Sequence, residues 1–80
     1  MSQIEKLLQK FMHSPQGVRY TDIAKILSHL GFEQVPAKGS HVKWKHQRLR
    51  NDLVIPVHNH ECKDFYKKQV RTQISMLINK

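Results

Sequence analysis

Apolar residues near the N-terminus recur at the spacing of an amphipathic helix. They stand at i, i+3, i+4 and i+7, as Ile4, Leu7, Leu8 and Phe11. This spacing places them on one face of a helix. Ser2 followed three residues later by Glu5 has the form of a capping box in front of this run. The pattern predicts a helix over about residues 3–13, followed by a connector at "HSPQG".

The next apolar run has the same helical spacing and lies between a start and a stop signal. Its inner face would consist of Ile23, Ile26, Leu27 and Leu30. Thr21 is placed to cap the N-terminus, and Gly31 stands where a left-handed C-terminal cap is needed. We therefore predict a second helix between these two residues.

From Phe32 onward the apolar pattern alternates, which is typical of strands. "FEQVP" is predicted as a first strand that Pro36 ends, and "AKG" as a tight turn. In the next strand one face carries Val42 and Trp44, and the other His41, Lys43 and Lys45. In the third strand, "DLVIPVH", one face carries Leu53, Ile55 and Val57, and the other Val54, Pro56 and His58.

The register of this last hairpin follows from the position of its turn. A turn centred between Leu49 and Arg50 brings apolar residues opposite apolar residues, as a half-buried sheet requires. The facing pairs would be Val42 with Val57, Trp44 with Ile55, and His41 with His58. A slip of two residues keeps every face but makes the two histidines diagonal neighbours. The shared face is thus a firmer prediction than the direct pairing.

The C-terminal segment "KDFYKKQVRTQISMLINK" predicts a last helix capped by Asp64. Its inward residues would be Tyr66, Val70, Ile74, Leu77 and Ile78, and its outward residues Lys67, Lys68 and Arg71. The predicted fold is α+β, in the order helix, helix, three antiparallel strands, helix. With helices packed on the apolar face of the sheet, the face that carries His41 stays open to solvent.

Length and charge restrict the kind of protein further. A chain of 80 residues can enclose one small core, so we expect one domain. Fourteen Lys and Arg against six Asp and Glu give a net charge of +8, which predicts a nucleic acid or another anionic partner. The N-terminus lacks the solid apolar segment of a signal peptide, and no apolar run is long enough to span a membrane. The single Cys62 suits a reducing compartment, and we expect a cytoplasmic protein without a membrane partner.

The segment "LSHLGFEQVPAKGSHVKWKH", followed by "VIPVH" and a Lys-rich helix, resembles the HicA or YcfA-like toxins of bacterial toxin–antitoxin pairs. The spacing of Leu-Gly-Phe, Gly-Ser-His and Pro-x-His carries this resemblance. It implies a double-stranded-RNA-binding-domain-like fold for residues 17–80 of a single domain, with residues 1–16 as an extra helix and connector. It also implies an endoribonuclease that cuts mRNA and is inhibited by a HicB-type antitoxin. The family's catalytic histidine matches His41, while "HNHECKDFY" departs from the shorter, charged segment often found there.

Metal-free RNA cleavage needs the residue types that surround His41. A 2′-hydroxyl attacks the adjacent phosphate, so the reaction requires a base, an acid and positive charge near the phosphate. Histidine can make either proton transfer, and Ser40 could orient its ring. We expect RNA contacts from Lys38, Gly39, Lys43, Lys45, Lys67, Lys68 and Arg71. This chemistry requires no cofactor.

Two further histidine interpretations stay open. His58 would be either a second proton-transfer group or a support for His41, and we favour support. "HNHEC" places His, His and Cys at alternate positions, but it lacks the two-pair spacing of structural zinc sites, so no metal site is predicted. Trp44 could stack on a base, although its face favours the core. His13, His29 and His46 are interpreted as structural or exposed.

Two other functions compete with a toxin nuclease. One is an RNA-binding module of the same fold that lacks catalysis. The other is a DNA-binding regulator in which the first two helices form a helix-turn-helix, but its recognition helix would carry a single Lys, Lys25. The first helix is either an ordinary core element, or it covers the flank of another helix or contacts a homodimer partner or the antitoxin.

Overall fold

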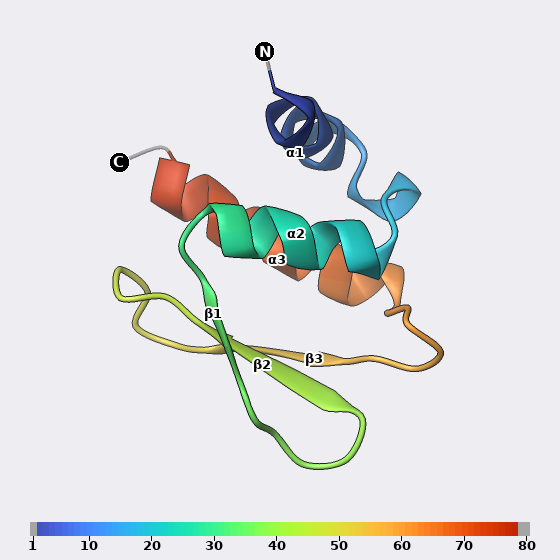
Figure 1. The fold of residues 1–80 in the computed structure, drawn as a ribbon, viewed down its shortest axis with the longest axis vertical. Helices are drawn as coiled ribbons and strands as arrows, with labels where there is room; N and C mark the ends of the chain where they lie inside the picture. The colour runs from blue at the N-terminus through green and yellow to red at the C-terminus, as the bar shows by residue number, and fades with distance from the viewer. Residues whose placement is uncertain (1, 79–80) are drawn as a thin grey trace.

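In the part of the chain that the structure describes, three α-helices and a three-stranded antiparallel sheet occur in the order α-α-β-β-β-α (Figure 1). The structure is a computed structural model and describes residues 2–78. The helices are α1 Gln3–His13, α2 Tyr20–His29 and α3 Asp64–Ile78, and a short 3-10 turn, η1, spans Pro15–Gly17. The strands, in sheet order, are β1 Glu33–Val35, β2 His41–Lys45 and β3 Leu53–Pro56. The predicted α+β class and element order are confirmed, and the architecture is compatible with a double-stranded-RNA-binding-domain-like fold.

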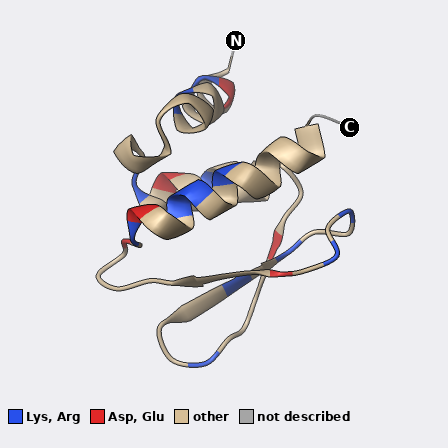
Figure 2. Cartoon of the chain, turned by 180° about the vertical axis from the view of Figure 1, so that it is seen from behind, with Lys and Arg blue, Asp and Glu red and all other residues tan. Residues whose placement is uncertain are grey.

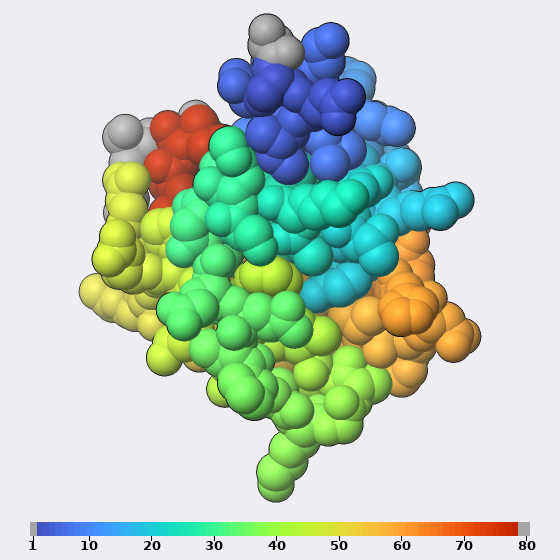
Figure 3. Space-filling model, viewed as in Figure 1, coloured from blue at the N-terminus to red at the C-terminus, as the bar shows by residue number. Residues whose placement is uncertain are grey.

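Helix α1 forms where the sequence predicts it. Ser2 is its N-cap, and its hydroxyl accepts a hydrogen bond from the backbone N–H of Glu5 at 3.3 Å and donates one to the Glu5 carboxylate at 3.1 Å. Phe11 is fully buried on the inner face of the helix. Helix α1 packs against α2 and covers one end of the molecule, whereas the loop between β1 and β2 projects at the opposite end (Figure 3).

The C-terminus of α2 is a Schellman motif. Gly31 adopts φ 94°, which L-residues rarely do. The N–H of Phe32 donates to the Leu27 carbonyl at 2.9 Å, and that of Gly31 to the Ser28 carbonyl at 3.2 Å. A Cβ on Gly31 would also come within 3.3 Å of Nε2 of His46. The predicted role of Gly31 is confirmed.

The N-terminus of α2 differs from the prediction. The helix begins at Tyr20, so Thr21 lies inside it and the expected Thr21 cap is wrong. The backbone N–H of Tyr20 donates instead to the carboxylate of Glu61 at 3.0 Å. A carboxylate from a distant part of the chain therefore takes the place of a local cap.

The two faces of the sheet are as predicted. Trp44, Leu53 and Ile55 are buried beneath the helices, and the indole N–H of Trp44 donates to the hydroxyl of Tyr20 at 3.1 Å. His41 and Lys45 are exposed on the opposite face, which no helix within residues 2–78 covers (Figure 1). We call this second surface the open face. Trp44 is thus a core residue, as its alternation predicts.

The register between β2 and β3 is shifted by two residues from the predicted one. The observed pairs are His41 with Pro56, Val42 with Ile55, Lys43 with Val54, and Trp44 with Leu53. His41 therefore faces Pro56, and the predicted direct pairing with His58 is wrong. The shift arises in the loop: the His46 ring accepts the Arg48 N–H at 3.0 Å, and the His46 carbonyl accepts the Leu49 N–H at 3.0 Å. These bonds make the chain turn earlier than the symmetric loop that we assumed.

Helix α3 is rotated about its axis relative to the prediction. Lys67 is only 4% exposed, whereas Ile78 is 51% exposed, so the outward Lys67 and the inward Ile78 are both wrong. Val70 and Ile74 are buried as expected. Asp64 lies in the first turn of α3 rather than in front of it. The partner that permits Lys67 to be buried is Glu61, at 3.2 Å.

Candidate functional site

The turn before β2 presents the Gly-Ser-His segment at the margin of the open face. Gly39 adopts φ 61°, and the N–H of His41 donates to the Lys38 carbonyl at 3.2 Å. The Ser40 carbonyl accepts the N–H of Val57 at 2.9 Å, which fixes the turn to the end of β3. A Cβ on Gly39 would meet no atom within 4 Å, so the space above this turn is open to a ligand.

His41 is exposed and lies next to the third strand. Because Ser40 and Val57 form a hydrogen-bonded pair, His41 and Pro56 form the next, non-hydrogen-bonded pair. In such a pair the Cα atoms are about 4.5 Å apart and the side chains lie close together. Within residues 2–78 the His41 ring has no side-chain hydrogen bond or ion pair, so it is accessible to a substrate.

Lysines lie near His41 on the open face and in the loop between β1 and β2. Figure 2 shows Lys and Arg positions on β2, on α3 and in both loops that connect the strands. Lys43 is half-buried between its cross-strand neighbours Val35 and Val54. Lys45 is exposed and faces Glu33, which offsets part of its charge. Lys43, the lysine of β2 nearer to His41, has no carboxylate opposite it on either neighbouring strand.

The basic residues of α3 are not on the open face. Helix α3 packs on the other side of the sheet (Figure 1). Lys68 is exposed and Arg71 is half-buried on this helix, while Lys67 is buried. The predicted RNA contacts thus divide into one group around His41 and another, Lys68 and Arg71, on a different surface.

The segment after β3 is a tight two-residue turn. Asn59 and His60 have φ 52° and 63°, and the flanking residues His58 and Glu61 exchange backbone hydrogen bonds of 2.8 and 3.0 Å. Positive φ at both central residues is the mark of a type I′ turn. The alternating side chains of "HNHEC" therefore do not share one extended face. Within residues 2–78, no three His, Cys, Asp or Glu side chains gather closely enough to hold a metal ion.

Glu61 joins three parts of the chain. Its Oε1 atom accepts the backbone N–H of Tyr20 at 3.0 Å and that of Cys62 at 2.9 Å, and lies 3.2 Å from Nζ of Lys67. Burial alone would raise the pKa of Glu61, but these hydrogen bonds and the Lys67 charge outweigh it and hold the pKa below its ordinary value. Periodicity does not reveal this arrangement, because its members come from three separate segments.

Glu61→Gln is expected to lower the free energy of unfolding at pH 7 by about 1–3 kcal/mol, because the nearly buried Lys67 loses its counter-charge. Since the folded-state pKa of Glu61 is depressed, its contribution is full above the unfolded-state pKa near 4.5 and disappears as the pH falls through the folded-state value. Urea titrations from pH 3 to 7 measure both effects. Glu33→Gln, an exposed site, is the control, and equal curves for the two variants would contradict the prediction.

A pocket of about 390 Å³ lies between the end of β3 and the start of α3. It is lined by Pro56, His58, Glu61, Cys62, Lys63 and Tyr66. Pro56 is the residue that faces His41, so the pocket adjoins the Gly-Ser-His turn. Burial raises the pKa of the Cys62 thiol to about 11, which keeps it protonated and unreactive at neutral pH.

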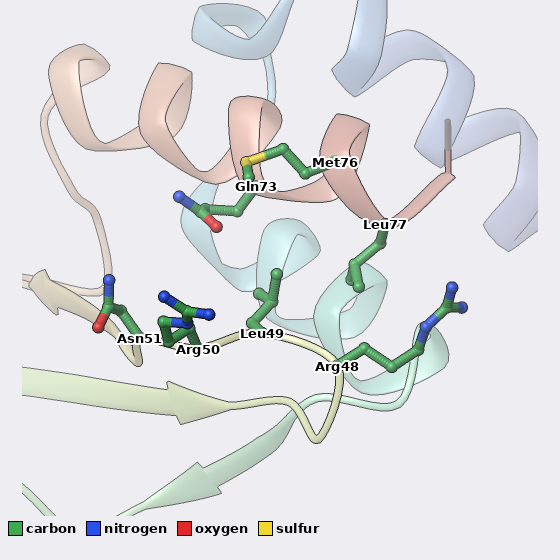
Figure 4. A pocket seen from close by; sticks show the side chains of 7 residues that line it. All are labelled: Arg48, Leu49, Arg50, Asn51, Gln73, Met76 and Leu77. Carbon is green, nitrogen blue, oxygen red and sulfur yellow. The ribbon is translucent and has the colours of Figure 1, made fainter. Parts of the chain in front are cut away.

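A second hollow, of about 460 Å³, lies at the other end of the sheet (Figure 4). It is formed by the loop after β2 and the C-terminal half of α3, with lining residues Arg48, Leu49, Arg50, Asn51, Gln73, Met76 and Leu77. Leu49 and Leu77 point toward each other across it, while Arg48 and Arg50 stand at its rim (Figure 4). This hollow is at the end of β2 away from His41, so it is separate from the candidate site.

One known protein family matches most of this chain. The sequence pattern of the family described as the HicA toxin of bacterial toxin–antitoxin matches residues 20–76, which is most of the chain. The chain belongs to the HicA toxin family. As a HicA toxin it is one component of a toxin–antitoxin pair. No curated protein and no solved structure matches the chain. Between residues 2 and 78, no helix is both long enough and apolar enough to cross a membrane.

The HicA match begins at the first residue of α2 and so leaves α1 and η1 outside it. His41, Lys43 and Pro56 lie within the matched region, as do all residues of the pocket beside them. The sequence predicts Ser40, His41 and His58 as site residues, but it does not group Lys63 and Tyr66 with them. The sequence indicates that grouping only through the short "HNHE" segment, which keeps the start of α3 close to the end of β3.

Proposed function

We propose that this HicA toxin is a metal-independent endoribonuclease that cuts mRNA in the cytoplasm and is neutralised by a HicB-type antitoxin. The observation that carries the proposal is the exposed His41, presented by a glycine turn on the open face with Lys38 and Lys43 close in sequence. Family membership supports the toxin role. The net charge of +8 supports an anionic substrate and an antitoxin with complementary acidic charge.

In the proposed reaction His41 acts as the general base. Its imidazole takes the proton of a ribose 2′-hydroxyl, the 2′-oxygen forms a bond to phosphorus, and the bond from phosphorus to the 5′-oxygen breaks. The leaving oxygen takes a proton from His58 or from water. Lys38 and Lys43 hold the phosphate and offset the charge that develops on it. His58 lies diagonally across from His41, which favours a role in supporting His41 over a role as the second proton-transfer group.

The groups away from the reacting phosphate have simpler proposed roles. The Ser40 hydroxyl contacts a phosphate or the His41 ring, and the absence of a side chain at Gly39 lets the RNA backbone approach. Lys45, Lys68 and Arg71 contact more distant phosphates. Lys67 is excluded from this set because it is buried against Glu61.

The alternative is an RNA-binding module without catalysis. It is favoured by one observation: no protein group within residues 2–78 orients the His41 ring, as a second residue usually does for a catalytic histidine. The DNA-binding regulator is less well supported, because Lys25, the only Lys of α2, already lies 3.8 Å from the Asp22 carboxylate.

Incubation of the purified protein with end-labelled single-stranded RNA, and with DNA of the same sequence, in excess EDTA tests the proposal. We expect the RNA to be cut and the DNA to remain intact, because DNA lacks the 2′-hydroxyl. RNA that is bound but uncut would support the non-catalytic module. Tighter binding to duplex DNA than to RNA would support the regulator.

A further inference from the structure

We propose that the pocket between β3 and α3 binds a nucleobase of the RNA, next to the phosphate that is cut. We call it the base pocket, and its lining residues are Pro56, His58, Glu61, Cys62, Lys63 and Tyr66. The inference rests on the proposed function, and it adds a subsite that selects the nucleotide at the cut.

The base pocket is adjacent to the candidate catalytic residue. Pro56, one wall of the pocket, is the cross-strand neighbour of His41. The next residue, Val57, donates its N–H to the Ser40 carbonyl at 2.9 Å. Adjacent strands are about 4.8 Å apart. A nucleotide whose phosphate lies at His41 therefore has its base within reach of the pocket.

The walls of the base pocket suit a flat aromatic ring. Tyr66, Pro56 and His58 provide planar or apolar surfaces, and the volume of about 390 Å³ admits one base with part of its sugar. Phe65 is 62% exposed beside the pocket and meets Tyr66 edge-on, with the ring centroids 5.2 Å apart at 83°. An exposed Phe next to the pocket extends the aromatic surface toward a second base.

Glu61 supplies a polar edge for this ring. Its three protein contacts all fall on Oε1, and within residues 2–78 Oε2 receives no hydrogen bond. The depressed pKa keeps the carboxylate ionised at neutral pH. An ionised carboxylate accepts hydrogen bonds from the amino group of a base. The pocket therefore suits a base that turns an N–H donor toward Oε2, either the amino group of cytosine, adenine or guanine or the N3–H of uracil.

Charge at the rim favours RNA over an apolar side chain of a partner protein. Lys63 lines the pocket and is exposed, and Lys38 and Lys43 lie on the adjoining turn and strand. A nucleotide brings a phosphate for these ammonium groups together with a ring for the aromatic wall. An apolar side chain would occupy the wall but leave Lys38, Lys63 and the Oε2 atom of Glu61 without partners.

Removal of one base tests the proposal. The substrates are an RNA with one mapped cut site and the same RNA with an abasic ribonucleotide on either side of the cut. The proteins are wild type, Tyr66→Leu and the control Gln69→Leu, an exposed position of α3 outside the base pocket, each checked by circular dichroism. We expect one abasic substitution to slow wild-type cleavage about 5- to 100-fold. Tyr66→Leu should cut intact RNA more slowly by a similar factor, and it should show no additional loss on that abasic RNA. Gln69→Leu should behave as wild type on all three RNAs.

Three results would overturn the base pocket while leaving the nuclease intact. The first is that wild type cuts the intact RNA and both abasic RNAs at equal rates. The second is that Tyr66→Leu slows cleavage of all three RNAs by the same factor. The third is that Tyr66→Leu cuts RNA at the normal rate but binds the antitoxin more weakly. If wild type cuts no RNA, the proposed function fails, and binding decides the pocket separately. The affinity of the protein is then measured for a set of short RNAs, each of which lacks the base at one position. We expect one RNA of the set to bind more weakly than the others, and equal affinities for all of them would overturn the proposal.

Discussion

His41→Ala is expected to slow RNA cleavage by about 10²–10⁴-fold, the usual contribution of a general acid or base. The histidine side chain is exposed and makes no side-chain hydrogen bond within residues 2–78, so its removal should leave the fold and stability nearly unchanged. Its loss should act on the chemical step and change RNA affinity little. Single-turnover rates at saturating protein measure the chemical step, and equilibrium binding measures the RNA affinity, so the two experiments separate these effects.

Two other histidines provide controls for this result. His29 is exposed on α2, away from the open face, and His29→Ala should cut as wild type does. His58→Ala should show a smaller loss than His41→Ala if His58 only supports the site. An equal loss would make His58 the second proton-transfer group. His41→Ala that cuts within twofold of wild type would contradict a catalytic role for His41.

Phe11→Ala is expected to lower the free energy of unfolding by about 3–5 kcal/mol, the usual cost of removing a fully buried Phe. Phe11 is 0% exposed and belongs to the same core cluster as Ile23 and Ile74. A chain of 80 residues has a total stability of roughly 4–12 kcal/mol. The variant should therefore be close to unfolding at 37 °C, which urea denaturation followed by circular dichroism measures.

This expectation bears on the role of α1, which lies outside the HicA match. Among the proposed roles, a core element is favoured by the burial of Phe11 and Pro15. Deletion of residues 1–16 should then unfold the protein rather than change its oligomeric state alone. His13→Ala, at an exposed position of the same helix, is the control. A Phe11→Ala variant with the urea midpoint of His13→Ala would contradict the core role.

Much of the fold could be predicted because its signals are local. The Ser2 and Glu5 capping box lies within one turn, and the C-cap at Gly31 within two. The faces of β2 and β3 follow from strict alternation, which a shift of two residues does not alter. For the same reason the prediction that His41 lies on the open face is correct, although the predicted register is wrong.

The missed features depend on contacts between distant residues. Glu61 bonds the N–H of Tyr20, which lies 41 positions earlier, and so replaces the cap expected from Thr21. The same carboxylate permits Lys67 to be buried, which turns α3 about its axis. His46 sets the hairpin turn and also bonds the Leu30 carbonyl at 3.0 Å. Neither periodicity nor propensity indicates which distant partner a polar side chain will find.

The chemistry of the cut ends tests the central claim most directly. The protein is incubated in excess EDTA with an RNA that has one mapped cut site, and with the same RNA carrying a single 2′-deoxy nucleotide at that site. Attack by the 2′-hydroxyl predicts a 2′,3′-cyclic phosphate and a free 5′-hydroxyl on the products, and no cut at the deoxy position. Products with a 5′-phosphate, or equal cutting of both RNAs, would contradict the account.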